Sequence, residues 1–121
     1  MNKYHARKTT VDGITFDSQK EANYFCELKL LLRSHIVKKF NTQVTFELQP
    51  SFERNGEKYR AINYVADFVV EYADGHTEVV DIKGVRTKDY LIKKKLLLYK
   101  NPEIDFKETF QMNYKDEHGG L

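Results

Sequence analysis

The fold of this chain is decided by residues 64–84, which read YVADFVVEYADGHTEVVDIKG. Two runs rich in Val, Tyr and Phe flank Asp74-Gly75, a dipeptide typical of the tight turn in a β-hairpin. Each run carries an acid in an otherwise apolar setting, Asp67 in the first run and Asp81 in the second. The pattern predicts two antiparallel strands with one carboxylate on each.

The length of the turn decides where these two acids lie. A three-residue loop, Ala73-Asp74-Gly75, with Gly75 in the left-handed conformation pairs Tyr72 with His76 and Asp67 with Asp81. A two-residue Asp74-Gly75 loop would instead send the two acids to opposite faces of the sheet. With the longer loop, strand alternation predicts one shared face for Val65, Asp67, Val69, Val79, Asp81 and Lys83.

Two carboxylates that face each other across a β-ladder repel, and a hard divalent cation with oxygen ligands removes that repulsion. We therefore expect Asp67 and Asp81 to hold Mg²⁺ or Mn²⁺, together with the Ile82 carbonyl and waters. Lys83 would orient or deprotonate a water, or stabilise a developing anion. The alternatives are an ion pair between Lys83 and Asp81, and an edge hairpin whose carboxylates are solvated. The apolar neighbours argue against the solvated strand.

The rest of the chain predicts one α+β domain in residues 9–114, between a flexible basic arm (1–8) and a loose tail (115–121). Its elements follow the order αβββαβ after a small hairpin around Asp12-Gly13. The expected elements are a helix from Asp17 to about Ser34, a strand at 43–52, a turn at Asn55-Gly56, strands at 58–72 and 76–83, a helix at 87–100 and a strand at 104–112. The inward residues predicted for the second helix are Leu91, Ile92, Leu96 and Tyr99.

These motifs resemble the PD-(D/E)XK nuclease superfamily, with Ala66-Asp67 in place of its Pro-Asp and Asp81-Ile82-Lys83 as its second motif. The wider pattern, in residues 11–22, 47–50, 64–68 and 78–84, is similar to a family of small phage nucleases and leans toward the Holliday junction resolvases. The resemblance implies a restriction-endonuclease-like fold, a mixed central sheet flanked by helices. It also implies a homodimer that cuts two strands symmetrically. Aromatic residues available for an interface are Tyr24, Phe25, Phe40 and Tyr64, each of which is equally suited to the core.

The resemblance further implies a catalytic glutamate on the first helix, and Glu21 matches it. Ser18-Gln19-Lys20-Glu21 is also a capping box, in which Glu21 is the third helical residue. Both roles stay open for Glu21. Gln49, at a strand end before Pro50, is a candidate for contact with DNA or water, with a hydrogen-bonded strand end as the alternative.

Positive charge is unevenly spread over a chain whose net charge is only +2. We expect the residues that bind DNA to come from the N-terminal arm and from around the second helix, where a solvated lysine face is the alternative. Besides Gln49, the candidates are Lys3, Arg7, Lys8, Arg86, Lys88, Lys93, Lys94 and Lys95. One cysteine, no apolar run of membrane-spanning length and no signal peptide lead us to expect a cytoplasmic protein, and the resemblance implies a phage protein in the host cytoplasm.

Together these features predict a metal-dependent endodeoxyribonuclease that acts on branched DNA in phage recombination or replication. A sequence-specific or nicking endonuclease of the same fold is one alternative. A DNA-binding or assembly module without cleavage activity is the other.

Overall fold

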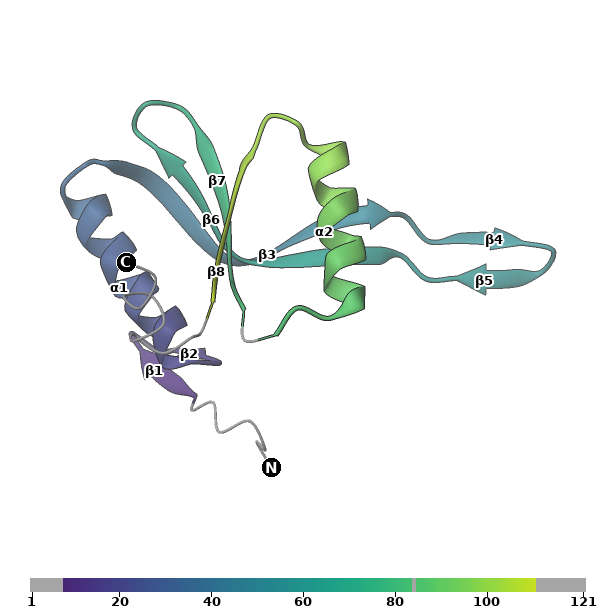
Figure 1. The fold of residues 1–121 in the computed structure, drawn as a ribbon, viewed down its shortest axis with the longest axis horizontal. Coiled ribbons are helices and arrows are strands. Elements are labelled where there is room, and N and C mark those ends of the chain that lie inside the picture. Colours follow the sequence, from purple (N-terminus) through teal and green to yellow (C-terminus); the bar gives the residue numbers. More distant parts are fainter. Residues whose placement is uncertain (1–7, 84, 111–121) are drawn as a thin grey trace, which may run out of the picture.

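A computed structural model describes residues 8–83 and 85–110 of the protein (Figure 1). After a small N-terminal hairpin come a helix, three antiparallel strands, a second helix and a last strand, so the predicted order is confirmed. A further hairpin is inserted between the first two of these strands. The elements are β1 (Thr9–Val11), β2 (Ile14–Phe16), α1 (Gln19–Arg33), β3 (Val37–Gln49), β4 (Phe52–Arg54), β5 (Glu57–Tyr59), β6 (Ile62–Tyr72), β7 (Thr77–Lys83), α2 (Lys88–Lys100) and β8 (Asp105–Phe110).

The central sheet has the strand order β3-β6-β7-β8. β3, β6 and β7 pair antiparallel through hairpin connections, whereas β8 pairs parallel to β7. A parallel neighbour requires a crossover connection, and α2 supplies it. The sheet is therefore mixed, and the fold is α+β, as predicted.

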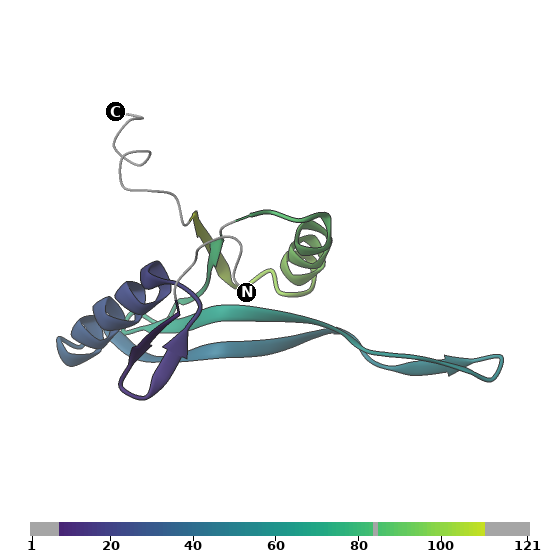
Figure 2. The ribbon, with the colours of Figure 1, turned by 90° about the horizontal axis from the view of Figure 1, so that it is seen from below.

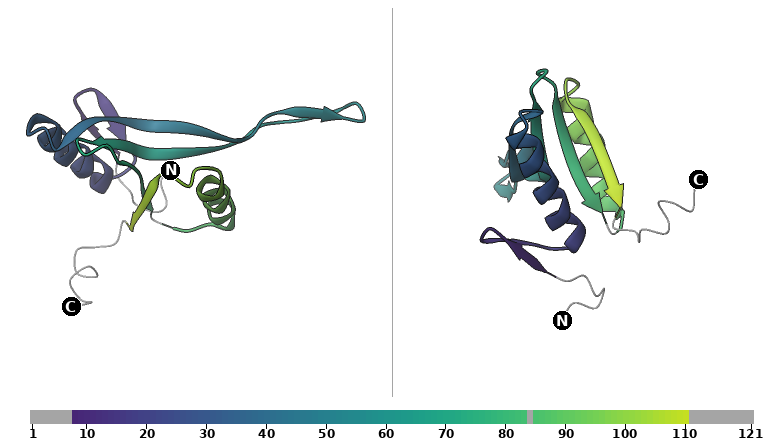
Figure 3. Two further views of the ribbon diagram at one scale, coloured as in Figure 1. Left: turned by 90° about the horizontal axis from the view of Figure 1, so that it is seen from above. Right: turned by 90° about the vertical axis from the view of Figure 1, so that its left-hand side faces the viewer.

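The two helices cover opposite faces of this sheet (Figure 3). On β7, Val80 belongs to the same buried cluster as Leu28 of α1, and its neighbour Val79 belongs to the same cluster as Leu97 of α2, as strand alternation requires. The α1-side cluster contains Phe16, Ala22, Phe25, Leu28, Val37, Phe68, Val70, Val80 and Ile82, and the α2-side cluster contains Leu48, Tyr64, Ala66, Val79, Tyr90 and Leu97.

Along the paired strands β3 and β6, even-numbered residues face α1 at one end of the pair and α2 at the other. On β6, Phe68 belongs to the α1-side cluster and Ala66 to the α2-side cluster. The ladder passes from Thr42–Phe68 to Val44–Ala66, and Gln43 between them has a φ of 52°. A left-handed residue inside a strand redirects the side chains that follow it. The prediction that Val65 shares a face with Val69 is therefore wrong, because Ala66 occupies that side and Val65 is exposed.

Both helices begin within two residues of the predicted positions, at Gln19 after the cap Ser18 and at Lys88 after the cap Thr87. The Ser18 hydroxyl accepts a hydrogen bond from the Glu21 backbone N–H at 3.1 Å, and the Thr87 hydroxyl accepts one from the Tyr90 N–H at 3.1 Å. Each cap satisfies a donor that the first helical turn leaves unpaired.

The predicted inward face of α2 is wrong. Tyr90 and Leu97 are its buried residues. Leu91, Ile92, Leu96 and Tyr99 are instead exposed by 41%, 60%, 38% and 83%. Neither α2 nor α1 is long and apolar enough to cross a membrane; this statement covers residues 8–83 and 85–110 only.

The aromatic residues considered for a dimer interface belong to the core. Phe25 and Tyr64 are buried in the two clusters, and Tyr24 and Phe40 pack half-buried against the α1-side cluster. Their ring contacts, such as Tyr24 with Phe68 at 5.0 Å, lie within the chain. The interface alternative for these four residues is therefore not supported.

A two-stranded arm, β4 and β5, projects from the body beyond the end of β3 (Figures 1 and 2). Its turn is Asn55-Gly56, with φ angles of 52° and 79°, as the sequence predicts. Every residue from Ser51 to Arg60 is exposed. Phe52 and Tyr59 stack with ring centroids 4.8 Å apart and planes 12° apart, yet both stay nearly half exposed.

Replacing residues 51–60 by Asn-Gly is expected to shift Tm by less than about 3 °C, because little core surface is lost. An isolated two-stranded hairpin contributes little stability of its own. Thermal unfolding followed by circular dichroism measures the shift. A fall of about 10 °C would mean that the arm is packed on the body of the domain.

Candidate functional site

The hairpin places Asp67 opposite Asp81, as predicted. The β6–β7 ladder pairs Phe68 with Val80, and one further residue along each strand brings the two aspartates together. The turn has the predicted three-residue form: the Tyr72 N–H donates to the His76 carbonyl at 3.0 Å, and Gly75 has a φ of 99°. The register that carries the site is therefore determined by a local turn.

The two carboxylates are held in place by backbone amides of the opposite strand. The Asp67 N–H donates to Oδ1 of Asp81 at 3.0 Å, and the Ile82 N–H donates to Oδ2 of Asp67 at 2.7 Å. Beyond Phe68–Val80, the last regular pair of the β6–β7 ladder, these backbone N–H groups thus donate to carboxylate oxygens. A hydrogen bond to a charged acceptor contributes about 1.5–3 kcal/mol, so this arrangement orients both side chains.

The surroundings of the pair are apolar on both strands. Asp81 is fully buried and Asp67 is half-buried, and their strand neighbours Phe68, Val80 and Ile82 are buried. Paired acids in such a setting are rare unless other groups compensate the charge. Lys83, the predicted third member, ends β7 two residues after Asp81, and its backbone is in register with Phe110.

Glu21 is part of the N-terminal cap of α1. It is 5% exposed, its N–H bonds to the Ser18 hydroxyl, and the same hydroxyl lies 3.4 Å from its Oε2. In the described part of the chain, no group of three His, Cys, Asp or Glu residues is arranged to hold a metal ion. Glu21 therefore does not complete a three-acid centre with Asp67 and Asp81 in this structure, and its catalytic role stays a prediction.

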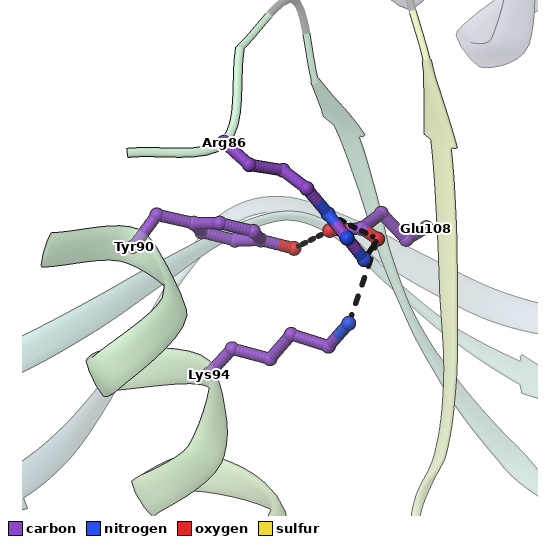
Figure 4. Close-up of polar contacts among 4 residues, drawn as sticks. All are labelled: Arg86, Tyr90, Lys94 and Glu108. Atoms are coloured by element: carbon purple, nitrogen blue, oxygen red, sulfur yellow. Dashed lines mark hydrogen bonds and ion pairs between the residues drawn. The ribbon is translucent and has the colours of Figure 1, made fainter. Parts of the chain in front are cut away.

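Sequence reasoning missed Glu108 on β8. Its backbone lies in register with Asp81 on the neighbouring strand. Three side chains converge on its carboxylate (Figure 4): Arg86 from the loop after β7, and Tyr90 and Lys94 from α2. Arg86 donates to Oε1 through Nε at 3.1 Å and also through Nη2, Lys94 Nζ lies 3.5 Å from Oε1, and the Tyr90 hydroxyl donates to Oε2. No motif marks Glu108, because the sequence places it in a separate strand.

One network of hydrogen bonds and ion pairs, called the Glu108 group, joins Glu108 to Arg86, Tyr90 and Lys94. Burial acts to raise the pKa of Glu108, but hydrogen bonds from Arg86 and Tyr90 and the charge of Lys94 outweigh it, so the pKa of this carboxyl lies below its ordinary value. Burial and the hydrogen bond to Glu108 raise the pKa of Tyr90 well above its usual range, and the negative charge of Asp81 adds to this rise. Tyr90 thus interacts electrostatically with Asp81 as well as with Glu108.

The predicted DNA-binding residues fall into three sets. Lys3 and Arg7 lie outside the described residues. Lys8 pairs with Asp17 at 2.9 Å, Lys93 with Asp89 at 4.0 Å, and Arg86 and Lys94 with Glu108. Gln49 is half-buried where β3 ends, and Lys88 and Lys95 are exposed on α2. Exposed ion pairs such as Lys8–Asp17 are weak and exchange readily for other anions.

Fold and site together define an α+β domain in which a pair of facing aspartates lies where two central strands lose their regular pairing. The chain belongs to the family described as "Protein of unknown function (DUF1064)", whose model matches residues 1–116. No curated protein and no solved structure matches it.

Proposed function

We propose that this protein is a metal-dependent endodeoxyribonuclease of the PD-(D/E)XK superfamily. It would hydrolyse phosphodiester bonds in branched DNA during phage recombination or replication, in the host cytoplasm. The observation that carries the proposal is the facing pair Asp67 and Asp81, oriented by backbone amides and followed two residues later by Lys83. The αβββαβ order and the mixed sheet support the restriction-endonuclease-like fold.

The donor set fits a hard divalent cation. Mg²⁺ is commonly bound through one or two carboxylates, with waters and substrate phosphate oxygens completing its shell. Asp67 and Asp81 supply that number without a third acid. When bound, the ion supplies Lewis-acid stabilisation of the phosphate and activates water.

The chain's own residues supply the rest of the chemistry. Asp67 and Asp81 would hold the ion, and the scissile phosphate would bind beside them. Lys83 either orients and deprotonates the attacking water or stabilises the charge that develops on the phosphate. The exposed lysines of α2, Lys88 and Lys95, contact the DNA backbone without reading base sequence. Symmetrical cutting of a branch by a homodimer is part of the same proposal.

The test is a substrate panel with the full chain and Mg²⁺ or Mn²⁺: a four-way junction, a flap, a linear duplex and a single strand. We expect cleavage of the branched substrates and little cleavage of the duplex. Cutting of the linear duplex at one sequence, at a rate equal to that of the branched substrates, would favour the sequence-specific endonuclease. Binding without cutting under either metal would favour the non-catalytic DNA-binding module.

A further inference from the structure

The Glu108 group has an inner acid and outer cations. The Glu108 side chain is 9% exposed, whereas the side chains of Lys94 and Arg86 are 21% and 45% exposed. Glu108 is also the residue of β8 in register with Asp81. Glu108, on the strand next to Asp81, therefore fixes two cationic side chains, Arg86 from the loop after β7 and Lys94 from α2.

This arrangement differs from an ordinary surface ion pair because it orders the two cations before an anion binds. Long cationic side chains lose rotamer freedom when they bind an anion, and a residue that orders them beforehand removes that cost from binding. Arg86 uses both Nε and Nη2 on one oxygen of Glu108, which holds the plane of its guanidinium. Two cations against one acid leave the Glu108 group with a net positive charge, which attracts an anion once a bound cation offsets the charge of Asp67 and Asp81.

We propose that Glu108 is a positioning residue, which holds Arg86 and Lys94 as a clamp for a phosphate of the DNA strand cut at Asp67 and Asp81. The inference rests on the proposed function and deepens it. Arg86 and Lys94 take the non-bridging oxygens of the phosphodiester, because guanidinium and ammonium groups bind phosphate as they bind carboxylate. Glu108 itself does not touch DNA and acts through these two cations.

The test combines Glu108→Gln, Arg86→Gln and the double variant. Glutamine keeps the size of Glu108 and an acceptor for Tyr90 but removes the charge that orders the cations. We expect Glu108→Gln to lower kcat by about 10–100-fold and to raise KM by about 3–10-fold, because disordered cations both misplace the phosphate and bind it less tightly. If Glu108 acts through Arg86, the double variant loses no more activity than the worse single variant.

Asp105→Asn is the matched control, because Asp105 is an exposed acid on the same strand. It removes one charge of the same sign and is expected to leave kcat and KM unchanged. Thermal unfolding of every variant separates a loss of stability from a loss of positioning. DNA binding is measured in parallel by fluorescence anisotropy with EDTA present.

Three results overturn the inference, and the first is unchanged cleavage by Glu108→Gln. Losses that multiply in the double variant would mean that Glu108 does not act through Arg86. Faster cleavage by Glu108→Gln would mean that Glu108 competes with the phosphate for Arg86 and Lys94. If the wild type cuts no substrate with either metal, the proposed function fails, and the clamp is judged on binding alone. Arg86→Gln must then weaken DNA binding at least about 3-fold, and this sensitivity must disappear in the Glu108→Gln background; otherwise the clamp fails as well.

Discussion

Asp81→Asn is expected to reduce DNA cleavage on the order of 10³-fold or more, while DNA binding stays measurable. Asparagine keeps the shape of the side chain and an oxygen that accepts the Asp67 N–H, so the hairpin register should persist. It lacks the negative charge needed to hold a hard cation. A 10³-fold loss corresponds to about 4 kcal/mol of transition-state stabilisation, within the range attributed to a metal ion.

Single-turnover cleavage with Mg²⁺ or Mn²⁺ measures this effect, and calorimetric titration of the metal gives a second readout. Glu78→Gln is the matched control, because Glu78 lies on the same strand but accepts a hydrogen bond from the Tyr72 hydroxyl at 3.0 Å, away from the aspartate pair. It should cleave like the wild type. Equal cleavage by Asp81→Asn and the wild type would remove Asp81 from the catalytic centre.

Phe68→Ala is expected to lower the free energy of unfolding by about 3–5 kcal/mol. Phe68 is 1% exposed, and its ring lies 5.0 Å from that of Tyr24 and 6.3 Å from that of Phe16, so it joins β6 to α1 and β2. Truncation would leave a cavity in the middle of the α1-side cluster. Because domains of this size are stable by only about 5–15 kcal/mol, the loss removes a large part of the total.

Urea unfolding measures this loss, with Tyr99→Ala as the matched aromatic control. Tyr99 is 83% exposed on α2, so its removal should change the free energy of unfolding by no more than about 0.5 kcal/mol. The pair of variants also tests which face of α2 is buried. If Tyr99→Ala cost as much as Phe68→Ala, the packing of α2 described here would be wrong.

The central hairpin was predictable because local residues determine it. Gly75 adopts the left-handed conformation that a three-residue loop requires, and this one turn sets the register in which residues 68–71 of β6 pair with residues 77–80 of β7. The start of each helix was predictable for the same reason, since Ser18 and Thr87 satisfy amides three residues away. The paired aspartates follow from the turn and need no knowledge of the rest of the fold.

The buried face of α2 was not predictable, because apolar residues occur on several sides of this helix. Leu91, Ile92 and Leu96 made as good a stripe as Tyr90 and Leu97. The difference comes from β8, where Glu108 accepts hydrogen bonds from the side of α2 that carries Tyr90 and Lys94. Hydrophobic periodicity records which residues are apolar, and a partner strand decides which of them it covers.

The sequence by itself determined the α+β class, the element order, the turn at Gly75 and the facing pair Asp67 and Asp81, because caps, left-handed turns and strand alternation act over a few residues. Only the tertiary structure decided the change of face at Gln43, the orientation of α2 and the position of Glu108 beside Asp81. These features depend on contacts between segments far apart in the chain, which form only when the sheet and both helices pack together.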